Sequence, residues 1–188
     1  GIPTDQRLIE MSNGDLDMIH DLTPEGTVAL IKQDPTVHGW FSGFPYAHPD
    51  PTLPAVVFNT QLEKFQDKRV RWALALMLDA RAFSLASYRG AATLSAIQVP
   101  PTGLHPNDYH IPLQEWLTNF TIEAGGQTFT PYDPSIPLQI ADSVRGQYDG
   151  VPTDETAIRQ AFGYGWWAQN LEAATLLLQD AGFTKQGN

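Results

Sequence analysis

Two proline-rich segments limit where regular structure can form in this chain. Residues 42–54 hold four prolines and residues 99–112 hold four more. Proline has no backbone N–H to donate and disfavours the helical conformation of the residue before it, so neither segment suits a central strand or a helix interior. We therefore expect a loop or hairpin tip at 42–54 and an irregular loop at 99–112.

The strongest helical pattern begins at Asp67. Val70, Ala73, Leu74 and Met77 follow at helical spacing and form one apolar face, and aspartate is a favoured N-cap residue. Further helices, with Thr23 and Thr153 as caps for two of them, are predicted at 5–12, 24–33, 80–88, 113–120, 138–146, 154–162 and 171–180.

Candidate strands are few and widely spaced, at 16–19, 37–41 and 55–60. The last of these, AVVFNT, is rich in β-branched and aromatic residues and is expected to be buried. Many helices with few strands indicate a chain of the α/β (α+β) class. The sparse strands and the polar tail after the last helix also suggest an incomplete domain.

The charge balance excludes some classes of partner. The 188 residues include 21 acidic and 11 basic side chains, a formal net charge of −10. Nucleic acid and anionic membrane surfaces both attract basic residues, so we expect neither as a partner. The apolar runs fall short of the ~20 residues that cross a bilayer, so we expect no membrane insertion, and we expect no signal sequence within these residues.

Motifs that carry chemistry are also missing. The absence of cysteine excludes disulfides, thiolate ligands and cysteine nucleophiles. His105, Asp108 and His110 lie close together in the second loop, but their spacing matches no standard zinc motif, so we expect no metal and no cofactor. No G-x-S-x-G, H-E-x-x-H or P-loop pattern occurs, and we expect no enzyme.

Three segments in a fixed order carry the most specific signal. They are residues 14–24 (GDLD, then TP), residues 58–79 (FNT, FQD, RVRWAL, then LD) and residues 174–183 (ATLLLQDAGF). This ordered set resembles the family 5 extracytoplasmic solute-binding proteins, which are the oligopeptide, dipeptide and nickel binders of ABC transporters. Lys64 departs from the family pattern, which often has proline there, and the stretch of 113–170 is longer than usual.

The resemblance implies a periplasmic-binding-protein type II-like fold, of which this chain is an internal fragment. Residues 1–54 would be the tail of a lobe-one segment, 55–60 a hinge strand, and 61–188 the first part of the second large lobe. The implied function is the substrate-binding component of a peptide-type ABC importer, which binds a peptide or similar small solute by two-lobe closure. A membrane permease is the implied partner, and the implied location is periplasmic or extracytoplasmic.

Hinge positions line the cleft in such proteins, so the resemblance makes Phe58 and Asn59 candidate ligand contacts. Trp40, Trp166 and Trp167 are further candidates, because tryptophan offers a large apolar area and one N–H donor. The tryptophans could instead have a structural role and pack the long loop onto the lobe. Asn59 could instead hold the hinge loop in place.

Arg69 and Arg71 lie at the start of a helix, where the helix dipole disfavours cations. Asp67 or Asp79 could offset that cost by pairing with one of them, which indicates structural ion pairs. A carboxylate clamp on the C-terminus of a peptide is the functional alternative, and the resemblance favours the structural role.

Two other functions stay open. One is a hydrolase with its site in the 99–170 loop region, and the other is a stand-alone protein-interaction domain that uses a Trp-rich patch. A fragment would also expose surface that the missing part covers, so concentration-dependent, artificial self-association is expected.

Overall fold

A computed structural model describes residues 2–41, 43–46, 48, 50–52 and 54–184 as a helical chain with two small antiparallel sheets. The helices are α1 (Thr4–Ser12), α2 (Pro24–Gln33), α3 (Glu63–Gln66), α4 (Lys68–Met77), α5 (Ala80–Tyr88), the π-helical turn η1 (Pro106–His110), α6 (Gln114–Asn119), α7 (Ile136–Val144), α8 (Glu155–Phe162) and α9 (Leu171–Asp180). The strands are β1 (Ile122–Ala124), β2 (Gln127–Phe129), β3 (Tyr132–Asp133) and β4 (Trp166–Trp167). The mixed α/β class predicted above is confirmed at this level.

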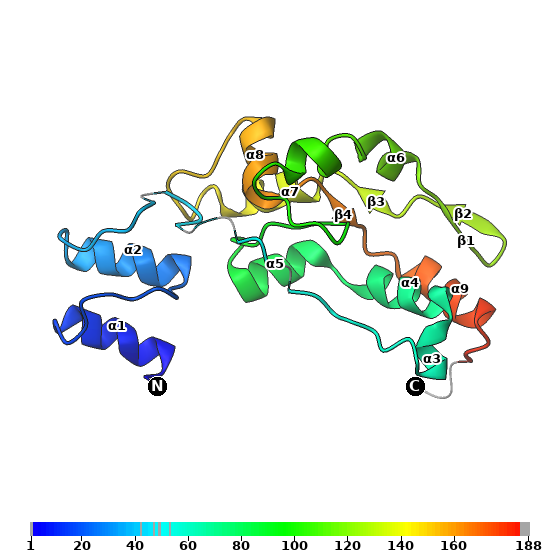
Figure 1. Cartoon of the computed structure of the whole chain (residues 1–188), viewed down its shortest axis with the longest axis horizontal. Helices are drawn as coiled ribbons and strands as arrows, with labels where there is room; N and C mark the ends of the chain where they lie inside the picture. The colour runs from blue at the N-terminus through cyan, green and yellow to red at the C-terminus, as the bar shows by residue number, and fades with distance from the viewer. Residues whose placement is uncertain (1, 42, 47, 49, 53, 185–188) are drawn as a thin grey trace.

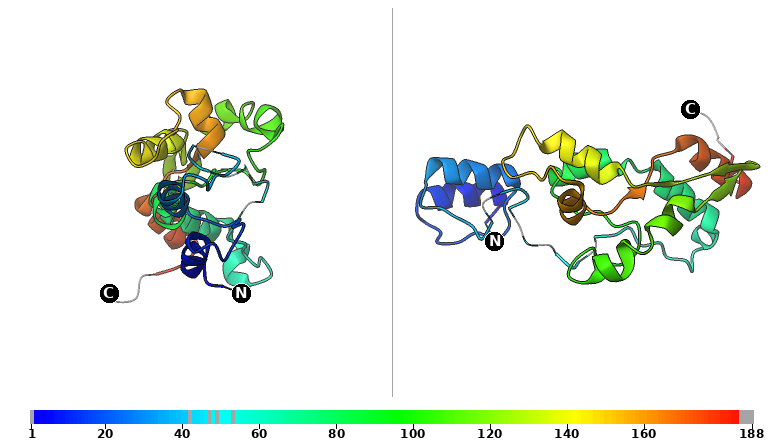
Figure 2. Two further views of the ribbon diagram at one scale, coloured as in Figure 1. Left: turned by 90° about the vertical axis from the view of Figure 1, so that its left-hand side faces the viewer. Right: turned by 90° about the horizontal axis from the view of Figure 1, so that it is seen from above.

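The chain is elongated, with the α1–α2 hairpin at one end and α4 with α9 at the other (Figure 1). The view from above in Figure 2 shows the same order along the long axis, with α7 and α8 between the two ends.

Side-chain caps explain where several helices begin. Asp67 accepts a hydrogen bond from the backbone N–H of Arg69 at 2.8 Å, and Thr23 accepts one from Gly26 at 3.2 Å. The predicted cap at Thr153 is wrong by one residue. Asp154 adopts the extended conformation of an N-cap and accepts a hydrogen bond from the backbone of Ala157 at 2.9 Å.

The first core lies between α4 and α9. Ala73 and Leu76 of α4, together with Ala173 and Ala174 of α9, are fully buried in it. Small side chains at the crossing allow the two helices to approach closely, and Ile122 of β1 covers the same core.

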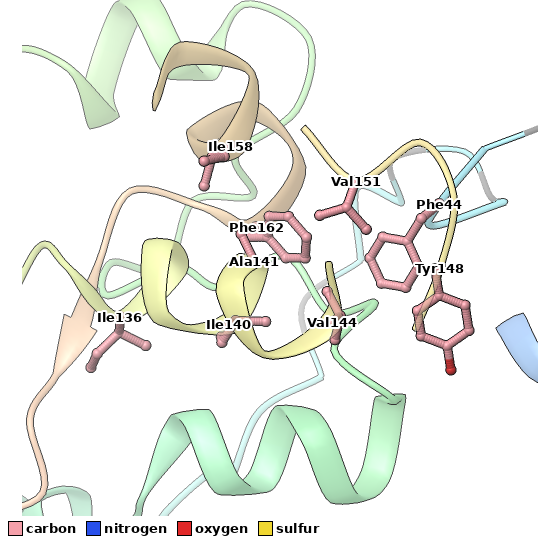
Figure 3. Close-up of a cluster of buried hydrophobic side chains, with 9 residues drawn as sticks. All are labelled: Phe44, Ile136, Ile140, Ala141, Val144, Tyr148, Val151, Ile158 and Phe162. Atoms are coloured by element: carbon pink, nitrogen blue, oxygen red, sulfur yellow. The ribbon is translucent and has the colours of Figure 1, made fainter. Parts of the chain in front are cut away.

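The second core is built by α7 and α8. Phe162 and Ile140 are fully buried there, and Phe44 enters from the first proline-rich loop (Figure 3). The ring of Phe44 stacks on Tyr148 at 4.9 Å and on Phe162 at 5.7 Å between centroids. Part of the predicted loop therefore belongs to the core.

None of the three candidate strands is a strand in the described structure. Residues 16–19, 37–41 and 54–59 are irregular, and the side chains of Val56 and Val57 are 81% and 86% exposed. The backbone of residues 54–58 has no backbone hydrogen-bond partner among the described residues, so a segment with strand composition has nothing to pair with. The prediction of a buried strand at 55–60 is therefore wrong for this structure.

The observed strands lie in the region predicted to be loop. Strands β1 and β2 form a hairpin with Ile122 opposite Phe129, and Gly125 and Gly126 turn the chain with φ of 57° and 73°. Positive φ at both central residues is the geometry of the type I′ turn, whose twist matches that of paired strands.

Candidate functional site

Strand β4 joins the two cores. It pairs antiparallel with β3, so that Trp167 lies opposite Tyr132 and Trp166 lies opposite Asp133. Successive side chains of a strand point to opposite faces, and Trp166 accordingly packs against the α7–α8 core while Trp167 packs against the α4–α9 core. Both tryptophans therefore pack against core residues in this structure.

Trp167 belongs to an aromatic cluster that also includes Trp72, Phe120, Tyr132 and Trp116. Trp167 meets Trp72 edge-on at 4.9 Å and Tyr132 at 5.9 Å, and Phe120 stacks on Trp72 at 5.6 Å. Trp116 lies 5.2 Å from Phe120 and is 57% exposed, so the cluster reaches the surface there. Sequence analysis missed Trp116 and Phe120, although their spacing of four residues is a signal for side chains that meet on one helix face.

Two glycines, Gly163 and Gly165, precede the tryptophans because backbone and ring atoms approach closely there. A Cβ on Gly163 would lie 2.0 Å from the carbonyl oxygen of Leu94, and one on Gly165 would lie 2.3 Å from the hydroxyl oxygen of Tyr132. That hydroxyl lies 2.7 Å from the carbonyl oxygen of Tyr164 and 3.0 Å from Oε1 of Gln114, and burial raises the pKa of Tyr132. Tyr132 is therefore a buried residue that packs at this junction.

The indole N–H of Trp166 is buried and has no hydrogen-bond partner among the described residues. A buried donor without a partner is costly, because it has lost its hydrogen bond to water. The feature singles out Trp166 among the candidate ligand residues.

The histidines of the second loop have structural contacts. His110 is 2% exposed, its Nε2 lies 3.0 Å from the carbonyl oxygen of Val99, and its ring stacks on Tyr164 at 5.3 Å. Burial lowers the pKa of His110, so the ring is held neutral. His105 directs Nδ1 to the carbonyl oxygen of Pro100 at 3.0 Å. No three His, Cys, Asp or Glu side chains gather into a metal-binding group within the described part of the chain.

The predicted ligand residues do not come together. Phe58 packs on Phe65 at 5.3 Å, and the side chain of Asn59 accepts a hydrogen bond from the backbone of Gln61 at 3.0 Å. Trp40 is 88% exposed and contacts His48 at 5.2 Å. Within the described residues, no aromatic contact links Trp40 or Phe58 to strand β4, so three separate places carry the five candidates.

An open hollow of about 350 Å³ lies beside α5 and α7 on the described surface, and it is lined by Arg81, Gln139, Asp142 and Ser143. None of the candidate ligand residues lines it. This hollow is polar and shallow, and it does not serve as a pocket for those residues.

Arg69 links two segments that are far apart in the sequence. It pairs with Asp67, with Nη2 2.6 Å from Oδ2, and its Nη1 donates to the backbone carbonyl of Asp180 at 2.6 Å. The hydrogen bond from Arg69 lowers the pKa of Asp67. Because Asp180 ends α9, this arginine ties the start of α4 to the last turn of α9, where a cation is favourable.

The other two charged residues do not form ion pairs among the described residues, in contrast to the prediction. Arg71 donates to the backbone carbonyls of Phe65 and Gln66 at 2.6 and 2.8 Å, and Asp79 caps α5 by accepting from Ala82 at 2.9 Å. Backbone groups at helix ends are closer to both side chains than any opposite charge.

Comparison with protein-family models matches residues 2–188 to the family described as bacterial extracellular solute-binding proteins, family 5 Middle. The chain belongs to this family. Searches of curated proteins and of solved structures give no match.

Two of the three segments that resemble family 5 contact each other in this structure. They are 58–79, which contains α4, and 174–183, which contains most of α9. These helices pack on each other, and Arg69 of α4 donates to the carbonyl of Asp180 in α9. The family is a solute-binding rather than a catalytic one, it serves ABC import, and its setting is extracytoplasmic. In the described part of the chain, no helix has both the length and the apolar character needed to cross a membrane.

Proposed function

We propose that this family 5 chain is part of the substrate-binding component of a peptide-type ABC importer. In this proposal the complete protein binds a peptide or a similar small solute by closing two lobes, and the closed form then docks on a membrane permease. The observation that carries the proposal is the family match over residues 2–188. Closure requires that the solute makes better contacts in the closed state than in the open one.

Residues 55–60 are the hinge strand in this proposal, between a lobe-one segment at 1–54 and the second large lobe at 61–188. The exposure of Val56 and Val57 supports it, because consecutive apolar residues are typical of a strand that is buried on both faces. Pairing with strands of the complete protein would cover both valines and satisfy their backbone groups.

The proposed solute contacts are Trp40, Phe58, Asn59, Trp166 and Trp167, and they differ in what they offer. Trp40 and Asn59 have exposed side chains, and Trp166 has an indole N–H without a partner in the described residues. Trp167 and Phe58 already pack on other rings and would form the walls behind these contacts.

The first experiment identifies the solute. Small molecules released from the purified full-length protein would be analysed by mass spectrometry, and we expect peptides of mixed sequence. A sugar or a metal chelate would contradict peptide specificity but keep the solute-binding role, and a solute-free protein that binds no peptide in calorimetry would contradict both.

The second experiment tests the contacts in the full-length protein. Replacing Trp40 by alanine should weaken binding of the recovered peptide roughly tenfold, as expected for a tryptophan at the centre of an interface. Trp116→Ala is the matched control, since it also removes an exposed tryptophan but lies outside the proposed contacts. Equal affinities of the two variants would contradict the role of Trp40.

Two-lobe closure has its own measurement. Small-angle X-ray scattering of the full-length protein should show a smaller radius of gyration with the recovered solute than without it. An unchanged radius at saturating solute would contradict closure and leave the binding result standing.

A further inference from the structure

The α1–α2 hairpin is held together by contacts between its own two segments. Leu8 lies against Gly26, where a Cβ would come within 3.4 Å of its side chain, and Ser12 Oγ donates to Gln33 Oε1 at 3.2 Å. Arg7 forms an ion pair with Asp21 in the connecting segment. These contacts do not depend on the rest of the chain, and Figure 1 shows the hairpin standing at one end of the molecule.

One end of α2 meets the rest of the chain. Glu25, in the first turn of α2, pairs with Arg89 at the end of α5, with 2.9 Å between Oε1 and Nε. The two side chains are 48% and 49% exposed, so water and salt reach the pair. Val28, one turn further along α2, packs against the α7–α8 core.

The backbone at the end of α5 places Arg89 for this contact. Arg89 has a φ of 55°, in the left-handed region that favours glycine, and Gly90 follows with a φ of 79°. A Cβ on Gly90 would lie 2.6 Å from the side chain of Val144, so only glycine lets α5 end against α7. A non-glycine residue in the left-handed conformation is unfavourable, and its presence points to a role for the arginine side chain.

Tyr148 completes the contact from the core side. Its ring is buried beside Phe44, and its hydroxyl points away from Phe44 and out of the core (Figure 3). Burial and the neighbouring Glu25 carboxylate raise the pKa of Tyr148 to about 12. The phenol thus stays protonated beside the Glu25 carboxylate.

We propose that the α1–α2 hairpin is an arm that docks reversibly on the rest of the chain, and that the pair of Glu25 and Arg89 is the latch of the docked position. Opening would leave the contacts inside the hairpin intact and would break this pair and the packing of Val28. Since an exposed ion pair contributes little, the docked and open positions are close in free energy. The inference goes beyond solute binding and does not depend on the solute.

The absence of cysteine in the chain allows a direct test by spin labelling. Cysteines replacing the exposed Ala29 on α2 and the exposed Gln160 on α8 would carry the labels, and pulsed dipolar spectroscopy would give their distance distribution. We expect that Arg89→Ala increases the population at altered distances about two- to fivefold, the effect of one exposed ion pair on a two-state equilibrium. Arg145→Ala is the matched control, because its pair with Asp142 lies within the α7 region.

Two further variants distinguish the loss of the Glu25–Arg89 ion pair from a general loss of stability. Arg89→Gly should open the arm as Arg89→Ala does while the melting temperature stays the same or rises, because glycine relieves the positive φ. Arg89→Lys keeps the charge and should restore most of the docked population. An unchanged distance distribution in both Arg89→Ala and Arg89→Gly, or an equal change in Arg145→Ala, would overturn the proposal.

Discussion

The α4–α9 pair and the α1–α2 hairpin are both pairs of packed helices, but they bury their contacts to different degrees. Leu76, Ala73 and Ala174 are fully buried between α4 and α9. In the hairpin, Leu30 is the buried large residue of α2, and Ile9 of α1 is 62% exposed. The difference shows that caps and periodicity are enough to form a helix, whereas a stable core also needs a second layer that covers the pair.

The largest expected effect comes from a cavity in the α4–α9 core. Leu76→Ala removes a fully buried side chain and should lower the free energy of unfolding by about 2–5 kcal/mol, measured by urea unfolding. Leu30→Ala is the matched change in the hairpin and should leave the main unfolding transition almost unchanged. Equal losses in the two variants would show that the hairpin is part of one cooperative unit.

The second prediction concerns the junction between the two cores, for which the hairpin has no counterpart. Gly165→Ala places a Cβ 2.3 Å from the Tyr132 hydroxyl at a φ of 144°, and should cost roughly 1–3 kcal/mol of stability. Gly146→Ala is the control, since nothing lies within 4 Å of its Cβ position. Thermal melts that do not distinguish the two variants would mean that the β3–β4 contact adds no stability.

Helix caps give the third and smaller effect. Asn170 caps α9 through the N–H of Ala173 at 2.9 Å, and Asn170→Ala should lower global stability by about 1 kcal/mol. Thr23→Ala removes the equivalent cap of α2, and its effect should be confined to faster hydrogen exchange in the hairpin. Faster exchange throughout the chain in the Thr23 variant would contradict the separation of the two regions.

The smallest effect is the response of the latch to pH. Burial acts to raise the pKa of Glu25. Hydrogen bonds from backbone and hydroxyl groups and the charge of Arg89 have the larger combined effect, so the pKa of Glu25 lies below the ordinary value of 4.5. A carboxylate with a lowered pKa stabilises the folded contact above the unfolded-state pKa, and this contribution is lost as the pH falls through the folded-state value. The groups that face this carboxylate are Arg89 of α5, Tyr148 after α7 and Thr23 of its own cap.

We therefore expect the arm to open as the pH falls below 4.5, observed in the same spin-label distances. The Glu25→Gln variant should show little pH response at this contact. A parent protein and a Glu25→Gln variant with the same pH profile would show that other carboxylates control the opening.

Local signals predicted the helices well, because a helix satisfies its backbone groups within one segment. Asp67 and Thr23 cap the helices that they were predicted to cap, and the helix after Asp67 follows the spacing of its apolar residues. The strand predictions failed for the opposite reason, because a strand takes its backbone partners from another segment. Residues 55–60 have strand composition without a partner, and β3 with β4 are too short to produce any periodicity.

The candidate site was predictable only in part. The tryptophan pair stood out in the sequence, but nothing local indicated that a two-residue strand would send Trp166 to one core and Trp167 to the other. Nor did the spacing of Arg69 from Asp180 suggest their hydrogen bond, which joins residues that are far apart along the chain.

By itself, the amino-acid sequence determined the family, the helices with their caps, and the exclusion of thiol chemistry, since each depends on residue types at short spacing. Only the tertiary structure decided which arginine pairs with an acid, which ring of the proline-rich loop enters a core, and where α2 touches the end of α5. Those outcomes depend on which segments lie next to each other in space, and that is settled by burial of the whole chain and not by any local pattern.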